Sequence, residues 1–230
     1  MIPLRDDNPT RRVPVVTRLL IVANVLVFIF ELTQGDALPE FLRDWGVVPG
    51  RLFASFSGDT SLPLELSTVF TSLFLHGGWL HLIGNMWYLW IFGDNVEDRM
   101  GSWRFLGFYL SAGFVAALLH STLQPGSPIP TVGASGAIAG VLGAYALAFP
   151  RARVMTLIPI FFFFQIVAVP ALVVLGIWFV FQFVAGTMSL GAGAGSGGVA
   201  WWAHIAGFAY GFVVMGIMTR RERARGVLVE

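Results

Sequence analysis

Residues 133–149 have the sequence GASGAIAGVLGAYALAF, a run of small and apolar side chains without a single charge. Gly136 and Gly140 give it a G-x-x-x-G spacing, which lets helix backbones approach each other closely inside a membrane. Pro150 follows directly and stops the run. We therefore predict a short membrane span over about Ser135–Phe149, packed tightly against a neighbouring helix.

The composition of the whole chain agrees with a membrane protein. Hydrophobic residues make up 56% of the 230 residues and charged residues only 12%, against about a quarter in soluble domains. A soluble chain of this length would need more charge to cover its outside, so we expect one membrane domain embedded in a lipid bilayer. The net charge of +1 gives no reason to expect a nucleic-acid partner. Without cysteine, the chain has no disulfide, thiolate metal site or cysteine nucleophile.

A membrane-spanning helix needs about 20 mostly apolar residues. Six segments meet this description, some of them marginally, which predicts an all-α polytopic membrane protein built as a six-helix bundle. The expected spans are about Val15–Leu32, Trp79–Asn95, Trp103–Leu123, Ser135–Phe149, Pro170–Val184 and Ala200–Met218.

The fifth span is ambiguous. Val154–Gly186 is too long for one ordinary helix, and Pro159 and Pro170 interrupt it. We favour Pro170 near the start of the span, with Met155–Val169 as an aromatic-rich segment near the cytoplasmic interface. A kinked or tilted longer helix is the alternative. Phe161–Phe164 is expected to face lipid or the interface.

The segments between the spans differ in character. Thr33–Gly78 is long and amphipathic, with short apolar patches but no span, Gln124–Thr131 is a proline-rich loop, and Gly186–Gly198 is a flexible loop. No small-residue cleavage site follows the first apolar run before Asp36–Glu40, so we expect a span there and not a signal peptide. The chain then divides into an N-terminal segment, a membrane domain and a basic tail, at residues 1–14, 15–219 and 220–230.

The arginines indicate the orientation. Six spans place both termini on one side of the membrane, and all but two of the 14 arginines fall on that side. Basic residues near spans stay in the cytoplasm, so both termini are expected there. Only Arg43 and Arg51 lie on the other side. The cytoplasmic set is Arg5, Arg11, Arg12, Arg18, Arg99, Arg104, Arg151, Arg153, Arg220, Arg221, Arg223 and Arg225.

With this orientation, the second, fourth and sixth spans all begin at the outer face, and each carries polar residues in its first turns. His81 and Asn85 are four residues apart and share one helix face, Ser135 opens the fourth span, and His204 follows the start of the sixth. The helical rise places all four at a similar shallow depth. Polar residues inside a membrane usually face a bundle interior or a water cavity, so a hydrated pocket is expected.

These residue types suggest acyl-transfer chemistry. A serine hydroxyl becomes a nucleophile when a neighbouring base takes its proton, and His204 is the candidate base for Ser135. The helix of His204 also carries a G-x-x-x-G spacing at Gly207 and Gly211, which favours close contact with the helix of Ser135. Neither helix contains an acidic residue within its span, so we expect a dyad whose imidazole is oriented in another way.

The developing oxyanion of such a reaction needs hydrogen-bond donors. His81 and Asn85 can donate from the second span. The backbone N–H of Ser135, at a helix start, is a further donor that the helix dipole assists.

Each residue also has a structural explanation. Ser135 alone is compatible with a serine packed between helices, and His204 with a hydrogen-bonded residue inside a bundle. His81 and Asn85 are compatible with contacts that hold helices together. His76 and His81 could suggest a metal site, but no third ligand lies at a diagnostic spacing, so we expect no metal and no cofactor.

Three motifs, in this order, make the chain similar to the rhomboid family of intramembrane serine proteases. They are H-x-x-x-x-H-x-x-x-N at His76, His81 and Asn85, G-x-S-G at Gly133, Ser135 and Gly136, and A-H-x-x-G at Ala203, His204 and Gly207. The resemblance covers about Val13 to Arg220.

The resemblance implies that Ser135 is the nucleophile and His204 the general base, with His81 and Asn85 at the oxyanion hole and His76, Gly133, Gly136 and Gly207 in support. It likens Glu97 and Arg99 to a cytoplasmic Glu-x-Arg element. The long Thr33–Gly78 segment would lie partly in the outer leaflet, and the fifth span would be a lateral gate for substrate helices.

Two positions depart from the family pattern. Many members carry an aromatic residue four positions after the serine, where this chain has Ala139, so Trp201 or Trp202 is expected to contact His204 instead. A Trp-Arg pair of the first loop is replaced by Ser67 and Thr68.

The leading expectation is therefore an enzyme that hydrolyses peptide bonds in or near transmembrane helices of membrane-protein substrates. The compact form favours the cell membrane, with the active site opening toward the outer face. A catalytically inactive relative that binds membrane clients is the alternative. A small channel or transporter is a third class, but polar residues at several depths or repeated halves are missing.

Overall fold

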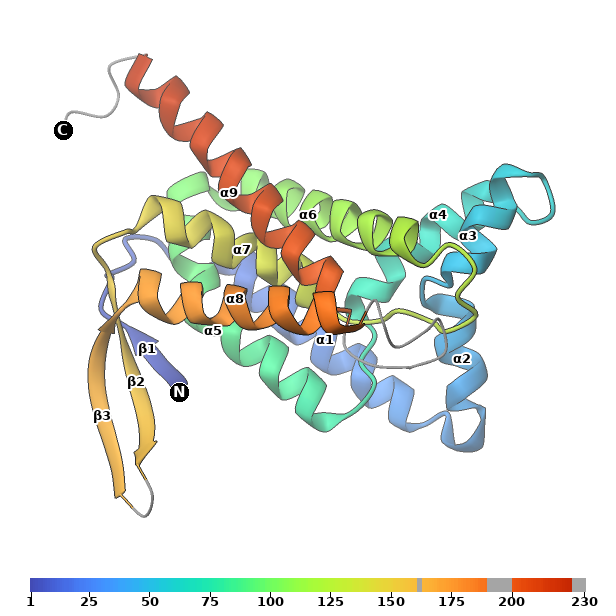
Figure 1. Ribbon diagram of the computed structural model, residues 1–230, viewed down its shortest axis with the longest axis horizontal. Helices are drawn as coiled ribbons and strands as arrows, with labels where there is room; N and C mark the ends of the chain where they lie inside the picture. The colour runs from blue at the N-terminus through green and yellow to red at the C-terminus, as the bar shows by residue number, and fades with distance from the viewer. Residues whose placement is uncertain (161–162, 190–199, 225–230) are drawn as a thin grey trace.

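The computed structural model describes residues 1–160, 163–189 and 200–224, and these are mostly helical (Figure 1). In chain order the elements are β1 (Ile2–Asp6), α1 (Val15–Leu32), the 3-10 helix η1 (Gly35–Ala37), α2 (Leu38–Trp45), α3 (Pro49–Phe56), α4 (Leu62–Thr71), the 3-10 helix η2 (Ser72–Phe74), α5 (Trp79–Met100), α6 (Ser102–Leu123), α7 (Ser135–Ala148), β2 (Arg153–Ile160), β3 (Phe163–Pro170), α8 (Ala171–Ser189) and α9 (Trp201–Ala224).

Among the described residues, four helices are long and apolar enough to cross a membrane, namely α1, α6, α8 and α9. Helices α4 and α5 meet the same criterion together, with a bend of 81° between them, which raises the number to five. Helix α7 has only 14 residues and is about 21 Å long, shorter than the hydrocarbon core of about 30 Å. The predicted polytopic membrane protein is therefore confirmed, with four or five spans by length and composition.

Helix α7 can be short because other helices enclose it. Every residue from Gly136 to Ala146 is buried, and α5, α6 and α9 pack around the helix. Irregular backbone at membrane depth is tolerated where protein or a water-filled cavity surrounds it. The ends of α7 therefore do not need to reach the membrane surface, and its first residue can open into the interior.

Glycines bring α7 and α9 into backbone contact. A β-carbon on Gly207 would overlap the carbonyl oxygen of Gly136, and one on Gly211 would overlap that of Gly140. A β-carbon on Gly140 would itself lie 3.3 Å from the carbonyl oxygen of Gly207. The close approach that the G-x-x-x-G spacings predict is thus present, and side chains at the starts of both helices can meet directly.

The long segment before α5 is folded into short helices. Pro39, Pro49 and Pro63 stand in the first two positions of α2, α3 and α4, where the missing N–H of proline costs no hydrogen bond. Val47 and Leu52 form a small core with Ala117 of α6. Prolines that only interrupt an apolar pattern in the sequence therefore begin helices here.

The expectation of an all-α chain needs a correction, because a three-stranded sheet precedes α8. Strand β2 pairs with β3 in antiparallel register from Arg153↔Pro170 to Ile160↔Phe163, and β1 adds along the other edge of β2. The predicted interfacial segment Met155–Val169 is thus a hairpin, consistent with its β-branched and aromatic residues. The alternative of a kinked longer helix is wrong, since Pro170 ends β3 and α8 starts at Ala171.

Some predictions fall partly on residues that the structure does not describe. Of the predicted loop Gly186–Gly198, the part up to Ser189 is the last turn of α8, and 190–199 lie outside the described residues. The same holds for Phe161 and Phe162 and for residues 225–230 of the tail, in which α9 continues to Ala224.

The bundle has two distinct ends (Figure 1). Helices α2, α3 and α4 gather at one end, which we call the loop end. The sheet and the C-terminal part of α9 lie at the other, which we call the sheet end. The first turns of α7 and α9 and the last turns of α8 point toward the loop end, so these three helices meet there.

Candidate active site

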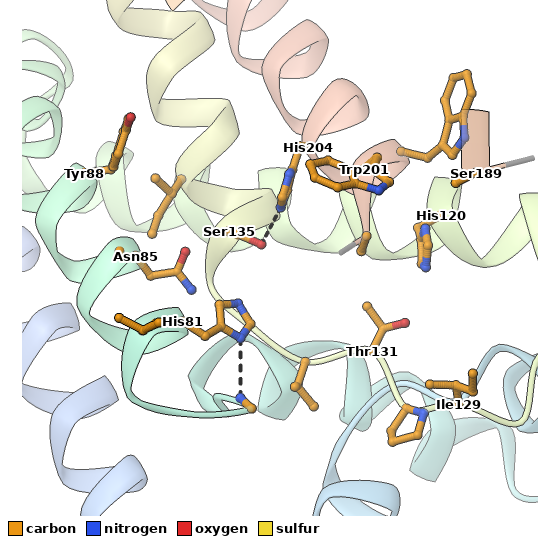
Figure 2. Close-up of a pocket in the computed structure, with 18 of the residues that line it drawn as sticks. His81, Asn85, Tyr88, His120, Ile129, Thr131, Ser135, Ser189, Trp201 and His204 are labelled. Carbon is orange, nitrogen blue, oxygen red and sulfur yellow. Dashed lines mark hydrogen bonds between the residues drawn. The ribbon is translucent and has the colours of Figure 1, made fainter. Parts of the chain in front are cut away.

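Ser135 and His204 form the centre of the site, although 69 positions separate them in the chain. Ser135 is the first residue of α7, and His204 lies in the first turn of α9. The Ser135 Oγ and His204 Nε2 atoms are 2.7 Å apart, a hydrogen-bond distance (Figure 2). The glycine contacts between α7 and α9 make this distance possible, because both side chains are short.

The second ring nitrogen of His204 has its own partner. Nδ1 lies 2.6 Å from Oε1 of Gln182, which reaches in from α8. A neutral imidazole has one donor and one acceptor nitrogen. The amide oxygen accepts from Nδ1–H, so Nε2 is left to accept the hydroxyl hydrogen of Ser135. Gln182 was not predicted as a site residue, although it is the only amide in the mostly apolar α8.

Two tryptophans lie beside the imidazole of His204. The Trp178 ring of α8 lies 5.9 Å away with an interplanar angle of 34°, and Trp201 meets the imidazole edge-on at 6.4 Å. The expected contact from Trp201 is present, whereas Trp202 donates through Nε1 to the carbonyl oxygen of Gly186. Trp178, which was not predicted to contact His204, is the nearer ring.

Gly133 places the start of α7 against His81 in the first turn of α5. Its φ of +125° is a conformation that favours glycine, and its N–H donates to the carbonyl oxygen of Ser72. A β-carbon at Gly133 would lie only 2.6 Å from Nε2 of His81. The Gly77 N–H donates to Nδ1 of His81 at 3.4 Å, so Nε2 of His81 carries the hydrogen and is a donor toward the site.

Asn85 is held in place from behind. Its Nδ2 donates to Nε2 of His76 at 2.9 Å, and the backbone N–H of His76 donates to the Glu31 carboxylate of α1 at 3.1 Å. His76 therefore contacts Asn85 and lies behind it, while Asn85 and His81 line the cavity beside Ser135 (Figure 2). A hydrogen on Nδ2 of Asn85 remains for another acceptor, since an amide nitrogen carries two.

The start of α7 adds backbone donors. The first N–H groups of a helix have no partner inside it, and the side chain of Ala134 before Ser135 forms no cap. Together with the positive end of the helix dipole, these groups favour negative charge beside the hydroxyl. Donors from α5 and α7 thus surround the space next to Ser135 Oγ.

A cavity of about 990 Å³ joins these groups. It is bounded by α5, α6, α7, α8 and α9 and contains enough polar surface to hold water. His120 of α6 also faces it, and its Nδ1 has no hydrogen-bond partner among the described residues. The lining includes His81, Asn85, His120, Ser135, Trp201 and His204.

Several known proteins are similar in sequence. The "Rhomboid protease GluP" of Bacillus subtilis is 36% identical over 132 residues, which are 57% of this chain and 24% of that protein. The human "Presenilin-associated rhomboid-like protein, mitochondrial" is 29% identical over 147 residues, 63% of this chain and 36% of that protein. "RHOMBOID-like protein 6, mitochondrial" of Arabidopsis thaliana is 30% identical over 154 residues, 56% of this chain and 49% of that protein.

The chain thus spans between about a quarter and about half of the length of these relatives. The rhomboid domain itself matches residues 63–221, well over half of the chain. This match begins in α4 and ends in α9, so it includes every side chain described around Ser135 except Glu31. With its apolar spanning helices, the chain is an integral membrane protein and belongs to the rhomboid family.

Proposed function

We propose that this protein is an intramembrane serine protease that hydrolyses peptide bonds in or near the transmembrane helices of other membrane proteins. Ser135 is the nucleophile and His204 the general base. The observation that carries the proposal is the 2.7 Å hydrogen bond between Ser135 Oγ and His204 Nε2, at the wall of a cavity lined by both polar and apolar side chains. The name of the Bacillus subtilis relative, a protease, supports the same class of activity.

The reaction proceeds in two acyl-transfer steps. His204 Nε2 takes the Ser135 hydroxyl proton while Oγ attacks the scissile carbonyl carbon, and the resulting imidazolium then protonates the departing amine. The C–N bond breaks, and an acyl ester on Ser135 remains. A water molecule from the cavity, deprotonated by His204, attacks the ester, and Ser135 regains its proton as the acid product leaves.

The oxyanion of both steps is stabilised by donors that already surround the site. His81 Nε2–H, the free Nδ2 hydrogen of Asn85 and the backbone N–H of Ser135 are the candidates. Such preorganised donors commonly contribute the largest single share of acyl-transfer catalysis. His76 supports Asn85, and Gly133 leaves room for the His81 ring.

The proposed topology has six spans, made by α1, α5, α6, α7, α8 and α9. Both termini and the sheet end lie in the cytoplasm, as the arginine distribution favours, and the cavity opens to the outer face of the cell membrane. The short helices of the loop end lie partly in the outer leaflet. Phe56 and Leu64, which expose more than half of their side chains there, support this placement.

Helix α8 is proposed as the lateral gate through which substrate helices enter. Its outer face is apolar and exposed at Ile177, Val180 and Phe181, as expected beside lipid or a substrate helix. Its first residue is anchored at the sheet end, where the Ala171 N–H donates to the carbonyl oxygen of Ala152. A displacement of α8 would therefore be largest at the loop end, beside Ser135.

The first test is labelling of the purified protein with a fluorophosphonate probe, in detergent and again in lipid. We expect wild type to react and both Ser135→Ala and His204→Ala to remain unlabelled. An unreactive wild type that is folded and helical would contradict the proposal and favour the function of a client-binding protein. The assay needs no knowledge of the natural substrate.

A further inference from the structure

We propose that Gln182 is a positioning residue for His204, and that through it the docking of α8 controls whether the base is oriented for catalysis. This inference rests on the proposed function and deepens it. It assigns the orientation of the imidazole, for which the sequence offered no acidic third residue, to an amide on the proposed gate helix α8.

The contact is short and shielded from water. Gln182 Oε1 lies 2.6 Å from His204 Nδ1, and the two residues are 5% and 8% exposed. A buried polar group left without its partner costs free energy, so the pair holds both side chains in place. Because Nδ1–H is committed to Gln182, Nε2 faces Ser135 as an acceptor.

An amide suits this position better than a carboxylate. A carboxylate would stabilise the imidazolium more strongly, but an isolated charge at membrane depth is expensive. The amide oxygen fixes the same tautomer without a charge. In a catalytic triad an acid orients the histidine; here the neutral amide oxygen of Gln182 has that role.

The second half of α8 makes few other buried contacts. Its buried residues are Ala171, Val174 and Leu175 near the sheet end, but beyond them only Gln182 and Gly186. Neighbours such as Phe181 and Met188 are 60% and 73% exposed. The hydrogen bond to His204 is therefore, with the bond from Trp202 to the carbonyl oxygen of Gly186, one of two hydrogen bonds among the described residues that tie the loop end of α8 to α9.

Trp178 and Gln182 are four residues apart, so they share one face of α8. The first lies beside the His204 ring and the second bonds to it. A displacement of α8 that admits a substrate helix would withdraw both contacts together. The base is then oriented only when α8 is docked, which links substrate entry and catalytic competence through one side chain.

The test compares Gln182→Leu with Gln182→Glu, using the rate of fluorophosphonate labelling as a function of pH. Leucine keeps the approximate size but cannot accept a hydrogen bond, whereas glutamate can. We expect the leucine variant to react roughly 10- to 100-fold more slowly, a part of what general base catalysis contributes. The glutamate variant should keep most of the rate. Its negative charge holds the proton on the imidazole, so the acid limb of its profile should move to higher pH.

Leu175→Ala is the matched control, because Leu175 is buried in the same helix nearer the sheet end and its truncation leaves the Gln182–His204 hydrogen bond in place. Its labelling rate should stay close to that of wild type. A leucine variant as fast as wild type, a control as slow as the leucine variant, or an acid limb unchanged in Gln182→Glu would each overturn the inference. A wild type no more reactive than Ser135→Ala would instead refute the proposed function, so the two failures are distinguishable.

Discussion

Gly133 and His81 lie so close together that no other residue fits at position 133. A β-carbon there would come within 2.6 Å of the imidazole Nε2, and the φ of +125° would strain any side chain. The glycine before the serine therefore serves the geometry of the neighbouring histidine as well as the turn into α7.

Gly133→Ala should abolish fluorophosphonate labelling, because the methyl group would push His81 or the start of α7 out of place. Gly126→Ala is the control, since a β-carbon at Gly126 meets nothing within 4 Å in the loop before α7. It should label like wild type. Normal labelling of Gly133→Ala would mean that the turn and His81 can adapt without loss of the site.

The backbone contact between α7 and α9 should contribute to the stability of the folded protein. Gly211→Ala places a methyl group against the carbonyl oxygen of Gly140, so the helices must separate, and we expect a loss of a few kcal/mol, as for overpacked cores. Thermal unfolding in detergent measures it. Gly176→Ala in α8, where a β-carbon meets nothing within 4 Å, should leave Tm unchanged or slightly raised. Equal melting of both variants would show that the contact is not needed.

The proposed movement of α8 can be blocked by a disulfide, and the chain has no cysteine of its own to interfere. A β-carbon on Gly186 would lie 3.3 Å from Cβ of Trp201, near the separation in disulfides. In the double variant Gly186→Cys, Trp201→Cys, oxidation should stop cleavage of a fluorescent transmembrane test helix but leave labelling by the small probe at the rate of the reduced variant.

Reduction of the same sample is the control, because it restores the freedom of α8 without a change of sequence. Cleavage should return on reduction. Equal cleavage by the oxidised and reduced forms would show that substrates reach Ser135 without a movement of the loop end of α8.

Asp6, in the N-terminal strand β1 at the sheet end, should make the stability of the folded protein depend on pH. Asp6 accepts hydrogen bonds from Tyr145 and Asn95, and burial raises its pKa to about 6, with help from the charges of Asp94 and Asp7. The folded state thus holds this proton more tightly than the unfolded state, in which the pKa is about 4. Stability associated with Asp6 is present below pH 4 and is lost as the pH rises from about 4 to 6.

Asp6→Asn keeps an acceptor for Tyr145 but does not titrate. We expect the wild-type Tm to fall relative to that of the variant between about pH 4 and pH 7, and the variant to be the more stable protein at pH 7. Parallel pH profiles for the two proteins would contradict the raised pKa of Asp6.

The apolar runs were sufficient to predict where the long helices lie. The first predicted span, Val15–Leu32, coincides with α1, since hydrophobicity over a membrane length is a strong signal. The hairpin was not predicted, because β2 and β3 are apolar on both faces and show no alternation that would distinguish a strand from a helix. Its pairing with β1 is a contact between segments about 150 residues apart, which a local pattern does not encode.

In the site too, local sequence patterns predicted some features and not others. Ser135, His204, His81 and Asn85 could be named from motifs, and the glycine spacings predicted the contact between the helices of Ser135 and His204. Gln182 belongs to no motif, and its partner is 22 positions away. A rule that every amide in an apolar helix has a polar partner would have selected it, but not the nitrogen to which it bonds.

The short length of α7 determines how deep in the membrane Ser135 lies, and therefore where along a substrate helix the proposed cut would fall. If its sheet end lies at the inner membrane boundary, Ser135 stands about 9 Å below the outer boundary, the difference between about 30 Å of hydrocarbon and about 21 Å of helix. A bond cut there leaves the outer fragment only about six apolar residues, at 1.5 Å each. So short a tail cannot hold a protein in a bilayer, whereas the inner fragment keeps most of its anchor. One cut would therefore release the outer part of a substrate and retain the rest, so the products would separate without a further step.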